Sequence, residues 1–371
     1  MDELSMFDLL PEDQAEQFKQ KKSTDWKWTF KDYPKEKNGL TVFSCFACGG
    51  GSTMGYKLAG CDVLGCVEID PRMNEIYVKN HHPKYNFCMD LRDFNKLPNE
   101  ELPPELFNLD ILDGSPPCTT FSMAGDREDS WGKKKKFREG QAEQTLDDLS
   151  FVFIETVAKL KPKVVIMENV EGLLLGEAFS YMQRIYADFK KNGYVVHHWL
   201  LKGEKMGVPQ TRHRVFFVAV QANLEIDPSW LDMTFNYEPV TYASIKQGHG
   251  KKINPNTKDY EMLSKAIPTD KNIAAVYERL GEKPRRFSAS ICWDENVLPT
   301  IVAKLFHYRP KERERISPLD VIHAQTFPED YDFCSDRYLD IDYLCGMSVP
   351  PVMMKRVVLR LIEQGVFDYK K

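Results

Sequence analysis

A cysteine in this chain stands where a nucleophile is expected. Cys118 follows Pro116 and Pro117, which are separated by three residues from a short apolar stretch, Leu109–Leu112. Proline has no backbone donor for a β-ladder and fixes φ, so the two prolines end the predicted strand and stiffen the turn. A thiol held on such a turn is suited to nucleophilic attack. The alternative is a buried cysteine in a proline-rich loop, and the rest of the chain decides between the two.

An acid and two arginines could serve such a nucleophile. Glu168 follows the apolar stretch 163–167, and a carboxylic acid there can protonate or hydrogen-bond a heterocycle nitrogen. Arg212 and Arg214 alternate in a predicted extended segment, so they share a face and suit recognition of a phosphate or carbonyl group. The alternatives are a surface acid or helix cap for Glu168 and ion pairs with neighbouring acids for the arginines.

The elements that must position these groups form a repeated strand–turn–helix pattern that starts at Leu40. The predicted strands cover residues 40–46, 62–69, 87–89, 109–113, 163–167, 194–201 and 215–220, and the predicted helices cover 52–59, a segment from Pro71, and 149–160. This alternation predicts an open, mostly parallel, doubly wound α/β sheet, which binds ligands at the carboxyl ends of its strands. The polar residues at or just past those ends are Glu68, Asp90, Asp113, Cys118 and Glu168.

A glycine run follows the first predicted strand. Gly49, Gly50 and Gly51 would let a ligand approach the start of the next helix. The order F-A-C-G-G-G is not G-x-G-x-x-G, so a dinucleotide and a nicotinamide oxidoreductase are disfavoured. Glu68 could accept hydrogen bonds from ribose hydroxyls, and the alternative for Glu68, as for Asp90, is a solvated loop carboxylate.

Composition places the chain among ordinary globular proteins. The 371 residues are 42% hydrophobic and 28% charged, and length alone suggests about two domains. No apolar stretch reaches the roughly 18 residues of a membrane span, and the N-terminus is too acidic for a signal peptide, so we expect a cytosolic protein without membrane contact. The nine cysteines give no four-ligand zinc pattern beyond the pair Cys45 and Cys48, so we expect reduced thiols and no metal.

The net charge of −5 argues only mildly against a nucleic-acid partner, because basic residues cluster locally. These clusters lie at 133–136, 251–252, 285–286 and 309–315. The segment 14–22 could form one polar helix, and Trp26, Trp28, Phe30 and Tyr33 follow among lysines. Such aromatic residues either stack on nucleic acid or, more often, pack on the adjacent domain.

The order of these motifs resembles the DNA cytosine-5 methyltransferase family. The motifs are P-P-C, then E-N-V, then Q-x-R-x-R, behind an F-x-x-x-G-G loop. The resemblance runs from about residue 42 to 220, resumes near 298 and has a terminal match at 343–354. It implies a sheet of the S-adenosylmethionine-dependent methyltransferase type with a second, smaller target-recognition domain. The expected domains are an N-terminal extension at 1–38, a catalytic domain at 39–221, a target-recognition domain at 222–310 and a return to the catalytic domain at 311–371, with a turn at 345–351 and a helix at 352–362.

The resemblance also implies roles for individual residues. For S-adenosylmethionine and its product S-adenosylhomocysteine they are Phe46, Ala47, Gly49, Gly50, Gly51, Glu68, Ile69, Asp90, Leu91, Asp113, Pro116, Leu149, Ser348 and Val349. For DNA they are Ser122, Lys133, Lys134, Lys135, Lys136 and Thr300. The sequence departs from the family at Cys48, where glycine is usual, and at Met347, where asparagine is common.

The implied reaction transfers a methyl group to carbon 5 of a cytosine flipped out of a specific double-stranded DNA sequence. The thiolate of Cys118 adds to carbon 6, Glu168 engages N3, and Arg212 stabilises charge at O2. Arg212 and Arg214 are the candidates to lower the pKa of the thiol from its free value of about 8.5. We expect a monomeric enzyme of prokaryotic or phage type, which could be paired with a restriction endonuclease.

Two alternatives remain at this point. The first is a transfer-RNA cytosine-5 methyltransferase of the same family, although the Cys-Phe-Thr signature common in that branch is absent from the variable region. The second is a catalytically silent DNA-binding protein, which the presence of Cys118, Glu168 and Arg212 disfavours.

The lysine-rich segment after Cys118 generates a prediction. Residues 119–140 are expected to form a loop that closes over DNA and brings Lys133, Lys134, Lys135 and Lys136 to phosphates. Replacing these four lysines by alanine should weaken DNA binding and flatten its dependence on salt concentration. Binding titrations over a range of salt check this, and an unchanged slope would reject the loop interpretation.

Overall fold

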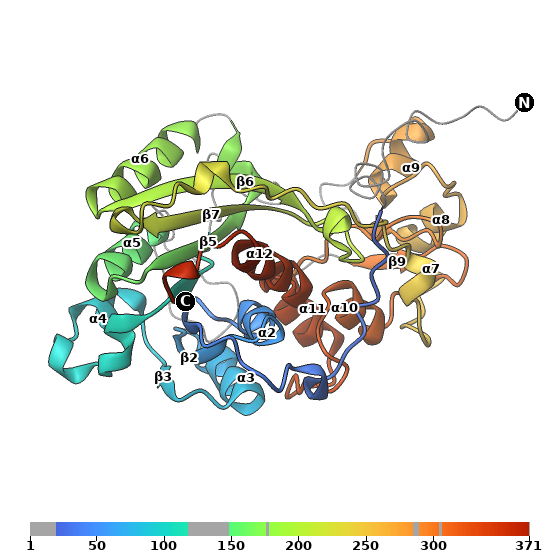
Figure 1. Cartoon of the computed structure of the whole chain (residues 1–371). Coiled ribbons are helices and arrows are strands. Elements are labelled where there is room, and N and C mark those ends of the chain that lie inside the picture. Colours follow the sequence, from blue (N-terminus) through green and yellow to red (C-terminus); the bar gives the residue numbers. More distant parts are fainter. Residues whose placement is uncertain (1–19, 118–147, 176–177, 285–288, 304–305, 371) are drawn as a thin grey trace, which may run out of the picture.

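A seven-stranded sheet forms the centre of the molecule (Figure 1). The structure, a computed structural model, describes residues 20–117, 148–175, 178–284, 289–303 and 306–370. The strand order is β3-β2-β1-β4-β5-β7-β6, and only β7 runs antiparallel to both of its neighbours. The strands are β1 (Thr41–Cys45), β2 (Asp62–Val67), β3 (Tyr85–Phe87), β4 (Ile111–Gly114), β5 (Val164–Val170), β6 (Tyr194–Lys202) and β7 (His213–Gln221). The predicted open, mostly parallel sheet is confirmed.

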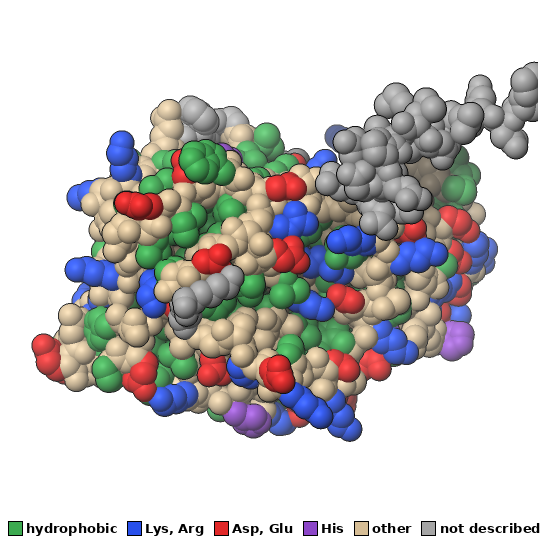
Figure 2. All heavy atoms as spheres, in the orientation of Figure 1, with side chains coloured by type: hydrophobic (Ala, Val, Ile, Leu, Met, Phe, Trp, Pro, Cys, Tyr) green, Lys and Arg blue, Asp and Glu red, His purple; other side chains and the backbone are tan. Residues whose placement is uncertain are grey.

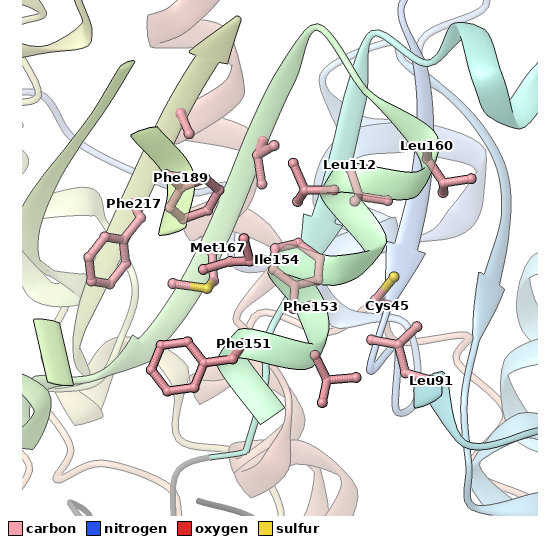
Figure 3. Packing of buried hydrophobic residues seen from close by; sticks show 14 of the residues in the cluster. Cys45, Leu91, Leu112, Phe151, Phe153, Ile154, Leu160, Met167, Phe189 and Phe217 are labelled. Atoms are coloured by element: carbon pink, nitrogen blue, oxygen red, sulfur yellow. The ribbon is translucent and has the colours of Figure 1, made fainter. Parts of the chain in front are cut away.

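Helices cover both faces of this sheet, so the central strands are apolar on both sides. On β5, Val165 and Met167 point to one face and Val164 and Ile166 to the other, as the strand period of two requires. The first face packs against α4 (Leu91–Lys96), α5 (Leu149–Leu160) and α6 (Ala178–Lys191). Figure 3 shows part of this core, where Phe153 and Ile154 of α5 lie against Leu112 and Met167 of the sheet.

The second face is closed by the C-terminal end of the chain. Helix α12 (Pro351–Glu363) packs against α2 (Gly51–Leu58), and its residues Val352, Met353 and Val357 join the core of this face. Gly55 permits the close approach of the two helices, because a Cβ atom there would lie 2.5 Å from Cβ of Met354. The last helix therefore packs on the sheet, and the bounds 311–371 of the expected return stay a prediction.

The remaining helices and strands belong to the segments between these elements and to the region after β7. They are α3 (Pro71–His81), α7 (Tyr242–Ile245), α8 (Lys258–Ser264), α9 (Ile273–Arg279), α10 (Pro318–Ala324), α11 (Tyr338–Met347), β8 (Ser290–Ile291), β9 (His307–Arg309) and β10 (Glu314–Arg315). Short 3-10 turns lie at Phe30–Asp32, Asn99–Glu101, Pro104–Asn108, Glu171–Leu174, Gly203–Met206, Ala222–Leu224, Pro228–Trp230 and Asp368–Lys370. Among the described helices, none is both long and apolar enough to cross a bilayer.

The region after β7 has an apolar cluster of its own. Strands β10, β9 and β8 form a three-stranded sheet, and the cluster includes Met262, Val276 and Trp293. Arg309 ties this region to α10, because its buried guanidinium forms ion pairs with Glu314 and Asp320. The proposed boundaries of a target-recognition domain stay a prediction.

Figure 2 shows acidic and basic side chains interspersed over the face seen in Figure 1.

Several predicted boundaries differ from those of the structure. Strand β5 continues through Glu168 to Val170, because β7 pairs with it antiparallel as far as Arg214. The third strand lies at 85–87 rather than 87–89. The predicted turn at 345–351 is helical up to Met347, where α11 ends.

The N-terminal aromatic residues pack on the folded chain. Trp28 is buried, and its Nε1 donates to the carbonyl of Thr326 at 2.8 Å. Packing on the adjacent part of the protein, one of the two interpretations left open above, is therefore confirmed for Trp28. Of the predicted polar helix at 14–22, residues 14–19 lie outside the described residues, and Lys21 forms an isolated β-bridge with Tyr237 instead.

Candidate active site

The turn that leads to Cys118 is held against strand β5. Pro116 is buried, and its carbonyl accepts a hydrogen bond from Nδ2 of Asn169 at 3.4 Å. Asn169 is itself buried within β5 and directly follows Glu168. Cys118, Ser122 and Lys133 to Lys136 lie outside the described residues. Sequence reasoning included Asn169 in the E-N-V motif but gave it no role, because an amide that binds backbone leaves no spacing signal.

Glu168 and Arg214 form a buried ion pair at this edge of the sheet. Nε of Arg214 lies 2.7 Å from Oε1 of Glu168, and the side chains are only 14% and 10% exposed. The strand register explains the contact, because Arg214 of β7 pairs with Val170 of β5. Glu168 stands two residues before Val170, so its side chain lies on the same face of the sheet as that of Arg214. Nη1 of Arg214 also donates to the carbonyl of His213 at 2.7 Å, which fixes the guanidinium. The pair places one carboxylate and one guanidinium beside the proline turn.

Arg212 has different partners from Arg214. Its side chain is buried, with Nη1 donating to the carbonyl of Ile301 at 2.9 Å and Nη2 to the carbonyls of Gly346 and Ser348 at 3.0 and 2.9 Å. Burial, followed by the charge of Arg214, lowers the pKa of Arg212. We expected both arginines to face one ligand. In the structure Arg212 joins its own segment to Ile301 and to residues 346–348. Its side chain differs in direction from that of Arg214 because Arg212 precedes β7 and does not follow the alternation of that strand.

Gln210 and Thr300 add hydrogen bonds between the segments that Arg212 connects. Thr300 donates its hydroxyl to the carbonyl of Thr211 at 2.6 Å, and the amide of Ile301 donates to Oε1 of Gln210 at 3.0 Å. Gln210 is buried and pairs with Leu298 in an isolated parallel bridge. Thr300, a predicted DNA contact, therefore lies directly beside the segment that carries the two arginines.

A narrow cleft lies at the carboxyl ends of β1 and β2. It is lined by Phe46, Val67, Ile69, Met89, Asp90, Leu91 and Leu149. Apart from Val67 and Met89, these are residues that the resemblance implied for the cofactor. Asp90 caps α4 by accepting from the amide of Arg92 at 2.8 Å. The walls are apolar and a carboxylate lies at the rim, which suits a flat heterocycle with a polar edge.

Glu68 connects the turns that follow β1 and β2. Its carboxylate accepts from the amide of Cys48 at 2.7 Å and from the amide of Asp70 at 2.8 Å. Burial raises the pKa of Glu68 to about 7. Each carboxylate oxygen has a second lone pair, so Glu68 can still accept from a ligand hydroxyl.

The turn at residues 46–51, here called the glycine loop, is closely packed. Phe46, Cys48 and Gly50 have φ values of 56°, 48° and 83°. Cys48 thus adopts the left-handed conformation that glycine takes without strain, at a cost of about 1–2 kcal/mol. A Cβ atom at Gly50 would lie 2.1 Å from Nε2 of His81, and one at Gly51 would lie 2.2 Å from the carbonyl oxygen of Val349. The glycines are required by the protein's own packing and not only by a ligand.

The remaining predicted cofactor residues take supporting positions. Ala47 is buried in the glycine loop, and its carbonyl accepts from the amide of Gly50 at 2.8 Å. Ser348 donates its hydroxyl to the carbonyl of Leu344 at 2.8 Å. Asp113 is fully enclosed and accepts from the hydroxyls of Ser44 at 2.6 Å and Tyr56 at 3.1 Å. The side chain of Asp113 is therefore engaged inside the protein.

Comparison with known proteins decides the family. The sequence profile of the C-5 cytosine-specific DNA methylase family matches residues 40–363, most of the chain. The chain belongs to this family. It is a DNA cytosine-5 methyltransferase, and the predicted family, fold class and enzyme activity are confirmed.

Curated relatives of this methyltransferase cover nearly all of it. The Type II methyltransferase M.FnuDI of Fusobacterium nucleatum is 29% identical over 358 residues, which are 90% of this chain and 96% of the relative. M.Sau96I of Staphylococcus aureus is 26% identical over 352 residues, which are 89% of this chain and 77% of the relative.

Solved structures share the fold of the methyltransferase. A putative DNA modification methyltransferase encoded within an E. coli prophage superimposes with a TM-score of 0.60 at 20% identity, covering 88% of this chain and 99% of that one. A mutant DNMT2 of Spodoptera frugiperda gives 0.59 at 16% identity, covering 87% and 100%. At such identities the likeness shows the fold alone.

The enclosed carboxyl group of Asp113 predicts a pH effect on stability. Burial raises the pKa of Asp113 from 3.8 to about 7, so this group stabilises the fold at low pH, and that contribution is lost as the pH rises through about 7. Relative to Asp113→Asn, the wild-type free energy of unfolding should fall by up to about 1.4 kcal/mol per pH unit between pH of about 4 and 7. Urea unfolding of both proteins across this range measures the difference. Glu68 titrates in both proteins and cancels, so a difference that does not change with pH contradicts the assignment.

Proposed function

We propose that this enzyme transfers a methyl group from S-adenosylmethionine to carbon 5 of a cytosine flipped out of double-stranded DNA, through a covalent adduct on Cys118. The observation that carries the proposal is the ion pair of Glu168 and Arg214 beside the turn that leads to Cys118. The family implies cytosine methylation, and this arrangement supports the route by which the base is activated.

The residues around the cleft fit S-adenosylmethionine. Its apolar walls suit an adenine ring, and the carboxylates of Glu68 and Asp90 suit ribose hydroxyls and an adenine amine. When bound, this group supplies an electrophilic methyl on a sulfonium. The glycine loop contributes Phe46 to the cleft and packs through Gly51 against Ser348 and Val349, which supports a site shared by these segments.

The base is activated in two coupled steps. The thiolate of Cys118 forms a bond to carbon 6 while the protonated carboxyl group of Glu168 gives its proton to N3 and then pairs as a carboxylate with Arg214, which makes carbon 5 enamine-like and nucleophilic. After carbon 5 is methylated, water takes its proton, the bond between carbon 6 and sulfur breaks, N3 returns its proton to Glu168, and the thiolate leaves. All of this requires the base to leave the duplex, as it does in other base-flipping methyltransferases.

Within this proposal Arg214 takes the role that sequence reasoning gave to Arg212. Arg214 holds Glu168 and is the guanidinium next to the carboxylate, so we assign it the stabilisation of charge on the base. Arg212 is bonded to three carbonyls and keeps Ile301, and with it Thr300, beside the site. We keep Thr300 as a proposed DNA contact.

The names of the relatives favour DNA over transfer RNA as the substrate. Each curated relative cited above is called a Type II methyltransferase, a name that also suggests pairing with a restriction endonuclease. The likeness to a DNMT2 protein concerns the fold alone. We therefore keep double-stranded DNA as the proposed substrate and a restriction–modification system as the proposed setting.

Methyl transfer from labelled S-adenosylmethionine tests the substrate and the nucleophile together. Plasmid DNA should be labelled and transfer RNA should not, and bisulfite sequencing should locate the modified cytosines. Cys118→Ser should abolish turnover and retain DNA binding. Labelling of transfer RNA alone, or full activity of Cys118→Ser, would overturn the proposal.

Glu168→Gln tests the acid. Because glutamine cannot supply a proton to N3, kcat should fall by about 10²- to 10⁴-fold while the Kd for DNA stays nearly unchanged. Single-turnover kinetics and a binding titration measure the two effects. Glu155→Gln, an exposed acid on α5, is the matched control and should keep full activity. Equal rates for the two variants would remove Glu168 from the mechanism.

A further inference from the structure

We propose that the N-terminal segment 26–33, here called the N-terminal strap, tunes cofactor affinity by supporting two side chains that hold the glycine loop. The inference rests on the proposed use of S-adenosylmethionine. The strap lies outside the part of the chain that matches the family, which begins at residue 40. Its ring contacts described below, His81 and Tyr331, do not line the cleft, so its proposed action is indirect.

The carbonyl of Gly49 is held by two donors. Nε2 of His81, at the end of α3, lies 3.0 Å from this oxygen, and the hydroxyl of Tyr331, in the C-terminal return, donates to it at 2.6 Å. A carbonyl oxygen only accepts, so the proton of His81 is on Nε2. Burial lowers the pKa of His81 to about 3, so the ring stays neutral and the contact persists at physiological pH.

This double hydrogen bond fixes the peptide between Gly49 and Gly50. A Cβ atom at Gly49 would lie 2.8 Å from the hydroxyl of Tyr331, and one at Gly50 would lie 2.1 Å from His81. The loop therefore has no room to shift toward either side chain. Its neighbour Cys48 is held in the left-handed conformation, and the amide of Cys48 donates to Glu68, the proposed ribose acceptor. The orientation of Gly49 and the position of Glu68 are thus set by one connected turn.

The N-terminal strap packs on both donors. The ring centroid of Phe30 lies 6.3 Å from that of His81 and 6.3 Å from that of Tyr331. Trp28 and Tyr33 flank Phe30 at 6.2 and 5.7 Å. Phe30 is therefore the contact through which the strap reaches the glycine loop.

Hydrogen bonds anchor the strap to the segment that carries Tyr331. Trp28 donates from Nε1 to the carbonyl of Thr326 and accepts from the amide of Glu329 at 2.9 Å. The amide of Phe30 donates to the carboxylate of Asp330 at 3.0 Å. The strap thus holds residues 326–331 in place, and without it the hydroxyl of Tyr331 would have fewer constraints on its position.

Calorimetric titration of the full chain with S-adenosylhomocysteine tests the inference. Tyr331→Phe removes one hydroxyl and should raise the Kd about 5- to 10-fold, the effect of one lost hydrogen bond. Phe30→Ala should raise it by a similar factor. His81→Gln, which can keep a donor near the position of Nε2, should bind more tightly than His81→Leu. DNA binding without the ligand should change less than about twofold, whereas a general loss of structure would weaken both.

Trp26→Ala is the matched control from the same strap. Trp26 packs edge-on against His323 at 5.1 Å, on the α10 side of the strap. The variant Trp26→Ala should lower the melting temperature and leave the Kd for S-adenosylhomocysteine unchanged. Hydrogen–deuterium exchange of residues 46–54 in the ligand-free protein adds a readout that needs no activity, and it should be faster in Phe30→Ala and Tyr331→Phe than in Trp26→Ala.

The outcomes separate the two proposals. If the wild-type chain does not bind S-adenosylhomocysteine, the proposed cofactor is wrong. If the wild type binds it and folded Tyr331→Phe binds equally well with unchanged exchange, the strap inference is overturned while the proposed function stands. Should Phe30→Ala fail to fold, the nearly isosteric Tyr331→Phe decides.

Discussion

The buried guanidinium of Arg212 is the interaction on which the arrangement of the site depends. It donates hydrogen bonds to the carbonyls of Ile301, Gly346 and Ser348. Those carbonyls belong to the end of the smaller region and to the C-terminal return, while Arg212 itself leads into β7. A single side chain thus fixes three parts of the chain relative to the sheet edge that carries Glu168. Because a buried charge without its hydrogen bonds is strongly destabilising, this geometry has few alternatives.

Close backbone packing provides the second constraint. The glycine loop lies against His81, Leu344 and the carbonyl of Val349 so closely that a Cβ atom has no space. The proposed cofactor site is consequently shaped by segments far apart in the sequence: the turn after β1, the end of α3 and the residues that follow α11. Cys48, in place of the usual glycine, is tolerated because the surrounding contacts hold it in the left-handed conformation.

Patterns in the sequence predicted the sheet well and the partners of individual side chains less well. Apolar stretches and their spacing identified every strand of the central sheet, and α5 was placed at its observed bounds. The position of Glu168 inside β5 could not be read from its own segment, since the strand is lengthened by pairing with β7. The different partners of Arg212 and Arg214 depend on where β7 begins, which periodicity does not locate to one residue. Asn169 and Gln210 belong to the quoted motifs, but their roles were missed because their amides bind backbone groups that only the fold brings near.

The contribution of α12 to the second face of the sheet has a consequence for how the polypeptide is made. Val352, Met353 and Val357 belong to the same core as Val42 and Ile111, which leave the ribosome more than two hundred residues earlier. Until the last helix emerges, that apolar surface has no native cover, and the nascent chain must remain protected from association with other chains. Premature termination near the C-terminus would therefore abolish folding of the whole catalytic unit and not merely trim its end.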